Sequence, residues 1–197
     1  KVNKSSTKNH SIRRNQNVKL QNLEYLTSLE EKTPLKDLTL KEYKKALAAF
    51  DFAIISDDSF VGAYLEKAKT LEQLNLWEDA IENYKITVEL DDPTSFAFLR
   101  IGECYERLKK STQAIQFYKK AVHEDPLLEK GWIAITELYI NKKNFNKALY
   151  NMNKAIEIDD QNPQYWRKFA EINLKLSLFE EAVEAFENCI ILLDFDL

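Results

Sequence analysis

The sequence predicts an all-α protein, an α-solenoid in which pairs of helices recur every 34 residues. Three columns of residues at this interval predict it: alanine in the second helix of each pair, an aromatic residue in the first helix, and aspartate or proline at the turn between pairs. A period of 20–50 residues is the mark of repeat architectures, whose units bury their apolar faces against one another. The alanine column comprises Ala46, Ala80, Ala114, Ala148 and Ala182.

Helix packing explains why each column holds its residue type. A small side chain lets two helices approach to about 8–10 Å, and large apolar side chains fill the groove beside it. Aspartate or proline ends one helix, and a polar residue caps the next. The aromatic column comprises Tyr64, Phe98, Trp132 and Trp166. The turn column comprises Asp58, Asp92, Pro126, Asp160 and Asp194.

Residues 95–128 carry the pattern in its most complete form. They match W-x2-L-G-x2-Y…A-x3-F…P at Phe98, Ile101, Gly102, Tyr105, Ala114, Tyr118, Ala121 and Pro126. This pattern resembles the tetratricopeptide repeat, a helix–turn–helix unit of 34 residues, and the resemblance extends over roughly residues 39–196. It implies a right-handed superhelix whose first helices line a concave groove. Lys67 and Asn173 depart from their columns, so we expect irregular packing near both.

The chain begins with a basic polar tail, residues 1–16, for which the composition predicts disorder. The tail is either solvated or attracted to acidic side chains of the groove, and both alternatives stay open. Residues 17–60 are predicted to hold an N-terminal helix and a degenerate half-repeat. The first of these helices covers residues 17–32, and the second opens at a capping box formed by Thr39 and Glu42.

Residues 61–197 are predicted to form four tetratricopeptide repeats, 61–94, 95–128, 129–162 and 163–196, each with two helices. The expected helices span 60–74, 77–90, 94–109, 111–124, 128–142, 145–158, 162–176 and 179–193. The last helix ends in an apolar run from Cys189 to Leu193, where such arrays usually carry a polar cap. This leaves two hypotheses: the chain is a segment of a longer protein, or its uncapped C-terminal end pairs with another copy.

The composition argues against an enzyme. Three glycines are too few for a glycine-rich phosphate loop, and the two histidines, His10 and His123, belong to no H-E-x-x-H motif. His123, Glu124 and Asp125 could touch a metal, but such a trio is more often a solvated helix end. We therefore expect no enzymatic activity, no cofactor and no metal. The remaining enzymatic alternative is a catalytic domain outside this segment.

Nucleic acid and membrane partners are not expected either. The repeat region is acidic, and acidic side chains repel phosphate. No apolar run reaches the roughly 18–20 residues that cross a bilayer, and no apolar signal core opens the chain, which favours a cytoplasmic location. Cys104 and Cys189 fall in different repeats, and we expect both to be reduced thiols in the core.

The resemblance also indicates which residues line the groove. They are Leu65, Lys69, Phe96, Leu99, Glu103, Lys130, Ile133, Glu137, Arg167 and Glu171. An apolar strip thus runs beside an acidic row, Glu103, Glu137 and Glu171, which favours a peptide with apolar anchors and basic flanks. In the alternative, the row only solvates the helices, with Arg100–Glu103 and Lys168–Glu171 as pairs within one helix.

The predicted function is that of a non-enzymatic scaffold that binds a peptide or protein segment in its concave groove. The alternative is a structural or self-associating repeat segment of a larger protein. An open groove would favour the scaffold, and a groove filled by the protein itself would favour the alternative.

Overall fold

The structure, a computed structural model, describes residues 37–91 and 94–194. The predicted tail at 1–16 and the predicted helix at 17–32 lie outside these residues. The chain divides into two compact units, residues 1–58 and 59–197, and each is described by itself below.

In the first unit the structure describes helix α2 (Asp37–Ser56). Its buried large aliphatic side chains lie two helical turns apart and so form one stripe. They are Leu40, Leu47 and Ile54. The helix begins two residues before Thr39, so its predicted start at a Thr39–Glu42 capping box is wrong.

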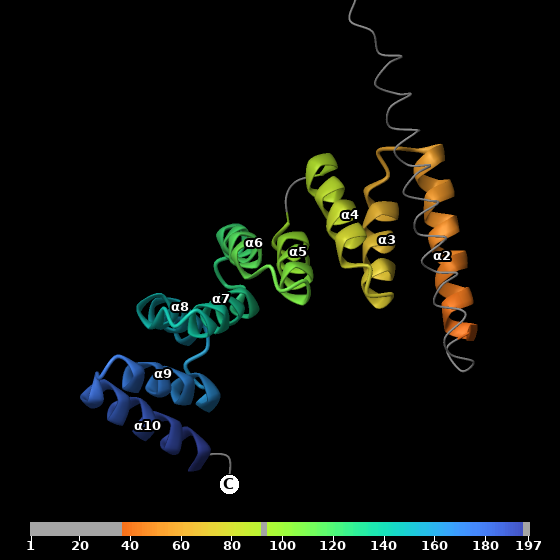
Figure 1. The fold of residues 1–197 in the computed structure, drawn as a ribbon. Helices are drawn as coiled ribbons and strands as arrows, with labels where there is room; N and C mark the ends of the chain where they lie inside the picture. The colour runs from red at the N-terminus through yellow and green to blue at the C-terminus, as the bar shows by residue number, and fades with distance from the viewer. Residues whose placement is uncertain (1–36, 92–93, 195–197) are drawn as a thin grey trace, which may run out of the picture. The chain divides into compact units, whose positions relative to one another are not determined.

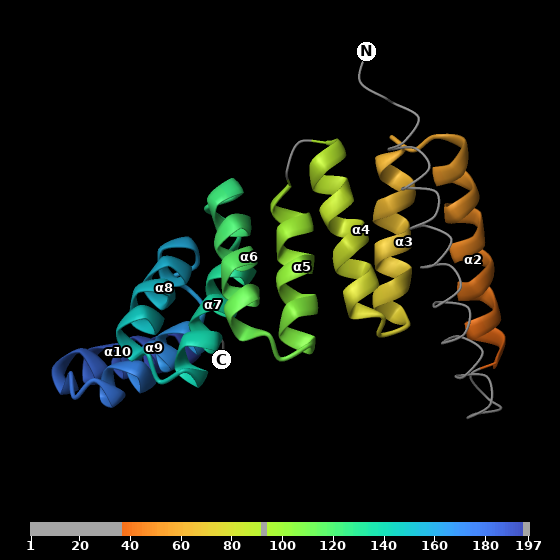
Figure 2. The ribbon, with the colours of Figure 1, turned by 45° about the horizontal axis from the view of Figure 1, so that its top comes forward.

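In the second unit the described residues form helices α3 to α10, in pairs that follow one another along the chain (Figures 1 and 2). The first helices are α3 (Val61–Gln73), α5 (Ser95–Arg107), α7 (Glu129–Asn141) and α9 (Pro163–Lys175). The second helices are α4 (Trp77–Leu90), α6 (Ser111–Glu124), α8 (Phe145–Ile158) and α10 (Phe179–Asp194). Within each series, helices begin 34 residues apart. No strand occurs in the described residues, and the predicted all-α solenoid is confirmed.

Each helix of this unit packs on its neighbours in the sequence, both within a pair and between consecutive pairs. Within this unit the alanine column is completely buried, as close helix packing requires. It comprises Ala80, Ala114, Ala148 and Ala182. One apolar cluster runs from Phe98 on α5 to Ile172 on α9, so consecutive pairs share a continuous core. This sharing is what couples each repeat to the next.

Gly102 marks the tightest contact within a pair. A Cβ atom built on Gly102 would lie 2.5 Å from the ring of Tyr118, which is buried on the facing helix α6. The same column holds alanine or threonine in the other repeats, so every repeat has a small residue at this position.

The turn inside each pair contains one residue in the left-handed region, with φ between 55° and 60°. These residues also recur at 34-residue intervals: Asn75, Lys109, Lys143 and Ser177. The backbone N–H that follows each of them donates back to the last turn of the preceding helix, for example Lys110 N to Tyr105 O at 2.9 Å. This is the Schellman arrangement, which usually places glycine at the left-handed position.

The turns between pairs are held by aspartate and tryptophan. Asp125 and Asp159 each accept a hydrogen bond from the backbone N–H two residues on, at 3.0 and 3.1 Å. The indole N–H groups of Trp132 and Trp166 donate to backbone carbonyls of the same turns, at 2.9 and 2.7 Å. Among the described residues no group of three His, Cys, Asp or Glu side chains is arranged to hold a metal ion.

Candidate functional sites on both sides of the helix pairs

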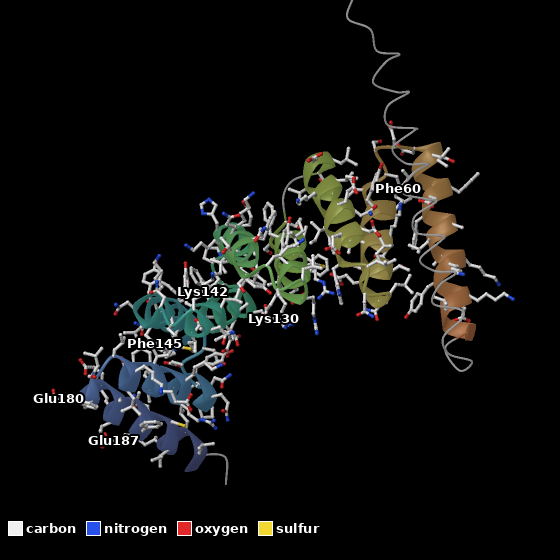
Figure 3. The ribbon with its side chains drawn as sticks, in the orientation of Figure 1. Phe60, Lys130, Lys142, Phe145, Glu180 and Glu187 are labelled. Atoms are coloured by element: carbon white, nitrogen blue, oxygen red, sulfur yellow. The ribbon has the colours of Figure 1, made fainter. Side chains whose placement is uncertain are left out.

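The predicted groove residues lie on the first helices of the pairs, and their exposure varies. Phe96 is 43% exposed, whereas Leu99 is only 8% exposed and offers little surface. Leu65 and Ile133 are half-buried, and Lys130 is exposed. Figure 3 marks Lys130 on α7. Among the predicted groove residues, the exposed apolar surface therefore comes chiefly from Phe96 and the half-buried Leu65 and Ile133.

Each glutamate of the predicted acidic row is already paired with a basic side chain of the chain itself. Arg100 binds Glu103, as predicted. The predicted Lys168–Glu171 pair is wrong, because Lys168 reaches back from α9 to Glu137 on α7. Arg167 takes its place and binds Glu171 at 3.1 Å, one turn along α9. The row consequently presents less negative charge than its sequence indicates.

Arg100 also joins two repeats. From α5 it donates to Glu72 on α3, a residue only 5% exposed, and Cys104 Sγ donates to the same carboxylate at 3.3 Å. Burial is the largest single influence and lowers the pKa of Arg100. The interactions with Glu72, Tyr84 and Glu103 together outweigh it, so this pKa stands above the ordinary value. Burial, reinforced by Glu72, raises the pKa of the Cys104 thiol and keeps it protonated. Both cysteines are free and buried, as predicted.

The two residues that depart from their columns behave differently. Lys67 is half-buried and interacts electrostatically with Asp79 on α4, whose pKa burial raises and Lys67 lowers. Asn173 is 1% exposed, and neither atom of its amide has a hydrogen-bond partner among the described residues. The expected irregular packing therefore takes the form of an unsatisfied polar group at Asn173.

A pocket of about 650 Å³ opens on the other side of the pairs, between the second helices α6 and α8, with α7 as its floor. We call it the cationic pocket. Its polar and aromatic lining comes chiefly from Lys119, His123, Trp132, Tyr139, Lys147 and Tyr150. The ammonium groups of Lys119 and Lys147 lie 5.9 and 5.6 Å from the ring centre of Tyr139. Cations at such distances are attracted to the ring face.

The cationic pocket and the predicted groove use different faces of α7. Successive residues of an α-helix are about 100° apart around its axis, so Trp132 and Tyr139 nearly coincide in direction. Ile133 and Glu137 lie roughly 100° or more away from them by the same rule. A ligand in the pocket would leave the groove face of the helix uncovered.

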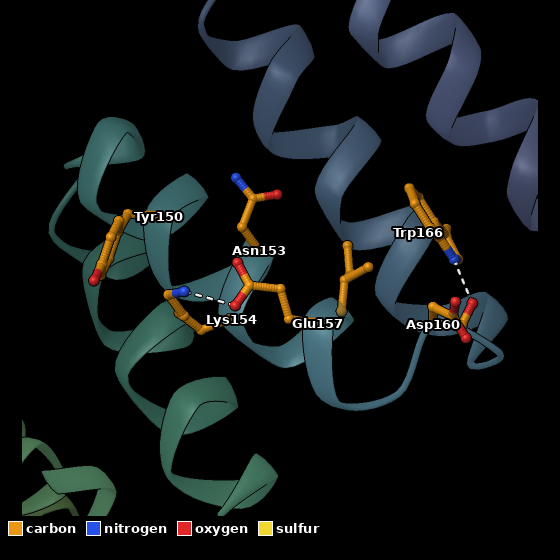
Figure 4. A pocket seen from close by; sticks show the side chains of 7 residues that line it. Tyr150, Asn153, Lys154, Glu157, Asp160 and Trp166 are labelled. Carbon is orange, nitrogen blue, oxygen red and sulfur yellow. Dashed lines mark hydrogen bonds and ion pairs between the residues drawn. The ribbon is translucent and has the colours of Figure 1, made fainter. Parts of the chain in front are cut away.

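The next pair of repeats carries an equivalent pocket with different charges, which we call the acidic pocket. It has a volume of about 470 Å³ and lies between α8 and the start of α9. Figure 4 shows Asn153, Glu157 and Asp160 in its lining, at positions 34 residues after Lys119, His123 and Pro126. The lysine of this pocket, Lys154, is bound to Glu157 at 2.6 Å.

Comparison with known families decides the class of the protein. Models described as tetratricopeptide repeat match residues 65–128 and 130–162. The chain is a tetratricopeptide repeat protein. The tetratricopeptide fold is that of a protein-interaction scaffold. No helix in the described part of the chain has the length and apolar character to span a membrane.

Solved structures share the fold of this tetratricopeptide repeat protein. A crystal structure of MamA superposes with a TM-score of 0.69 at 21% identity, over 82% of this chain and 94% of that one. MamA 41-end from Desulfovibrio magneticus RS-1 gives 0.64 at 15% identity, over 86% and 93%. YrrB, described as a TPR protein with an unusual peptide-binding site, gives 0.64 at 17% identity, over 80% and 81%. A search of curated proteins found no match.

Sequence reasoning missed the cationic pocket, because it treated the aromatic column that contains Trp132 only as core. The signal that could have found it is the pair of lysines, Lys119 and Lys147, which flank Tyr139 in space. Lys85 repeats this arrangement one repeat earlier: its ammonium group donates to Tyr105 Oη at 3.2 Å.

Proposed function

We propose that the protein is a non-enzymatic scaffold that binds an extended peptide or protein segment along its first helices. The scaffold comprises the four predicted repeats, 61–94, 95–128, 129–162 and 163–196, with residues 17–60 as an N-terminal helix and a degenerate half-repeat. The observation that carries the proposal is the row of partly exposed apolar side chains on consecutive first helices, led by Phe96 at 43% exposed. A cytoplasmic location stays a prediction.

Apolar anchors would supply most of the affinity at this face. Burying a large apolar side chain stabilises a complex by roughly 1.5–3 kcal/mol, whereas exposed ion pairs contribute about 0–1 kcal/mol. Glu103, Glu137 and Glu171 already have internal partners, so basic flanks of a peptide would compete with Arg100, Lys168 and Arg167. That YrrB is described as having a peptide-binding site supports a peptide as the ligand class.

Fluorescence anisotropy with a labelled peptide tests this proposal. The probe alternates leucine with small residues and carries two lysines at each end. The double variant Phe96→Ser/Ile133→Ser should bind it about tenfold more weakly than the parent. The matched control is Phe179→Ser, which removes a phenylalanine that is 63% exposed on a second helix. Equal affinities for the parent and the Phe96→Ser/Ile133→Ser variant would contradict the proposal that the peptide binds in the groove.

One observation favours a second candidate, a self-associating segment. Val183 and Ile190 on α10 are each 57% exposed, although the residues that precede them by 34 positions, Leu149 and Ile156, are half-buried and buried. Self-association through α10 would cover them. Light scattering after size exclusion would detect it as a mass above the monomer that the variant Val183→Glu/Ile190→Glu loses. A parent that stays monomeric at high concentration would exclude it.

A further inference from the structure

We propose that the cationic pocket is a second binding site, for an acidic peptide segment with one aromatic or aliphatic side chain. It lies on the second-helix side and is independent of the groove proposed above. Its charge is the first reason. Lys119, His123 and Lys147 line it, and no aspartate or glutamate does.

The two lysines have no carboxylate partner within the described part of the chain, unlike Lys154 in the acidic pocket. They come from different helices, α6 and α8, and both approach the ring of Tyr139 on α7. Two like charges near one ring repel each other. A carboxylate bound beside either lysine would relieve that repulsion and form an ion pair with it.

The floor of the pocket supplies the apolar part of the site. Val122 and Tyr139 are buried and present only their outer edges, and the Trp132 ring is held in place by its hydrogen bond to Pro126 O. A fixed aromatic floor with cations at its rim is the arrangement that anchors an apolar side chain and orients flanking carboxylates.

The neighbouring pocket limits the length of the anionic ligand. Towards α9 the equivalent positions hold Glu157 and Asp160, so a polyanion that continued along the array would meet carboxylates. A short acidic segment fits this alternation of charge, whereas a nucleic acid needs cations along its whole path. The acidic pocket also serves as an internal comparison, because several of its lining residues occupy equivalent repeat positions and its charge differs.

Fluorescence anisotropy with three labelled peptides tests the proposal on the full chain. The probes are GEDFEDG, its neutral counterpart GQNFQNG, and GEDGEDG, which lacks the aromatic residue. The parent should bind GEDFEDG at least about fivefold more tightly than either control, as expected for two exposed charge contacts and one apolar contact. No measurable binding of GEDFEDG, or equal binding of all three peptides, would overturn the proposal.

Protein variants then locate the site. Lys119→Gln/Lys147→Gln should weaken GEDFEDG binding about fivefold or more and leave the melting temperature close to that of the parent. Lys109→Gln/Lys143→Gln removes the same charge from exposed turn residues and should change little. The same loss in both double variants would mean that net charge, not the pocket, is responsible. Unchanged affinity in Lys119→Gln/Lys147→Gln would overturn the site.

Three further measurements exclude rival explanations. Reversal of the charges in Lys119→Glu/Lys147→Glu should give a preference for GKRFKRG over GEDFEDG. An oligothymidylate of twelve nucleotides should bind the parent more weakly than GEDFEDG. Tighter binding of the oligonucleotide would mean that the ligand class is nucleic acid and not an acidic peptide. The groove variant Phe96→Ser/Ile133→Ser should bind GEDFEDG like the parent, so failure of the groove proposal and failure of this one remain distinguishable.

Discussion

Helices α8 and α10 occupy the same place in successive repeats, yet they bury the same pattern to different extents. Ile156 on α8 is 8% exposed, and Ile190, its equivalent on α10, is 57% exposed. Helix α8 packs on α7 of its own pair and also on α9 of the following repeat. Among the described residues, α10 packs on α9 of its own pair. The residue type is identical, so the neighbour alone makes the difference. Burial in a repeat array is a property of the contact between units.

The acidic residues of α10 sharpen this contrast. Figure 3 marks Glu180 and Glu187 on this helix, where α8 has Asn146 and Asn153. Glu187 also corresponds to Lys119, which approaches a tyrosine of the following repeat. Helices α6 and α8 thus carry neutral or basic groups at both positions, and α10 carries carboxylates. A helix that covered α10 would meet a different charge from the one that α9 meets on α8.

The largest expected effect comes from truncating this matched pair of isoleucines. Ile156→Ala should lower the free energy of unfolding by about 2–5 kcal/mol, because it leaves a cavity in the shared core. Ile190→Ala should change it by less than about 0.5 kcal/mol, as an exposed substitution does. Urea denaturation followed by circular dichroism measures both. Similar losses for the two variants would show that α10 is covered in solution.

A second test disturbs one inner repeat and asks how far the effect travels. Ala114 is completely buried within the α5–α6 pair. Ala114→Trp should cost about 1–3 kcal/mol or more by overpacking. Because repeats couple mainly to their neighbours, amide hydrogen exchange should increase more in residues 95–128 than in 163–196. A melting curve that matches the parent would show that the alanine column is wrongly assigned.

A third test concerns Asn173, which occupies in the last repeat the place that Leu71 occupies in the first. Both side chains are buried, but the Asn173 amide has no partner among the described residues. Asn173→Leu should therefore raise the free energy of unfolding by about 1–2 kcal/mol. The reverse change, Leu71→Asn, should lower it. Destabilisation by Asn173→Leu in the denaturant midpoint would mean that the amide is satisfied.

A fourth test uses pH and the cluster that joins α3 to α5. The folded protein raises the pKa of the Cys104 thiol above its ordinary 9.0, so the unfolded chain loses that proton first. Stability from this group is complete well below pH 9 and falls as the pH rises above it, by at most about 1.4 kcal/mol per pH unit. Cys104→Ala should flatten the decline of the melting temperature between pH 8 and 9.5.

The control for this fourth test is Ile115→Val, which loosens the core without removing a titrating group. It should lower the melting temperature equally at all these pH values. Tyr84 and Tyr118 have pKa values raised by burial, from an ordinary 10.0, so they add to the decline only at higher pH. A slope that Cys104→Ala leaves unchanged would contradict the assignment.

The sequence predicted most of the fold, because columns such as Ala114 report helix contacts that recur in every repeat. The helix bounds in residues 61–194 came within two residues of those observed for the same reason. The start of α2 was missed, because a capping pattern such as that of Thr39 and Glu42 can also fall inside a helix that begins earlier. Local signals fail where two starts are possible.

The site was harder to predict, because ion pairs join residues that no repeat period relates. Lys168 reaches Glu137 of the previous repeat rather than Glu171 of its own helix. Arg100 likewise reaches Glu72 across a repeat boundary. Long flexible side chains choose partners from the whole surface around them, and a column lists only the residues of one helix. Placement in space was needed to find these pairs and the lysines around Tyr139.

The smallest expected effect is also the one that should be equal in inner and last repeats. Lys109 and Ser177 hold the left-handed position of their turns, with φ of 60° and 59°. A residue with a Cβ is strained there by about 1–2 kcal/mol, and glycine is not, although glycine loses more entropy on folding. Lys109→Gly and Ser177→Gly should therefore each stabilise the protein by about 0.5–1 kcal/mol. The strain is local, so a neighbouring repeat should not alter it.

Asn75→Gly should stabilise the protein less, because asparagine tolerates this conformation. Denaturant midpoints of the three variants measure the effect, and a clear difference between Lys109→Gly and Ser177→Gly would show that even turn strain depends on the following repeat.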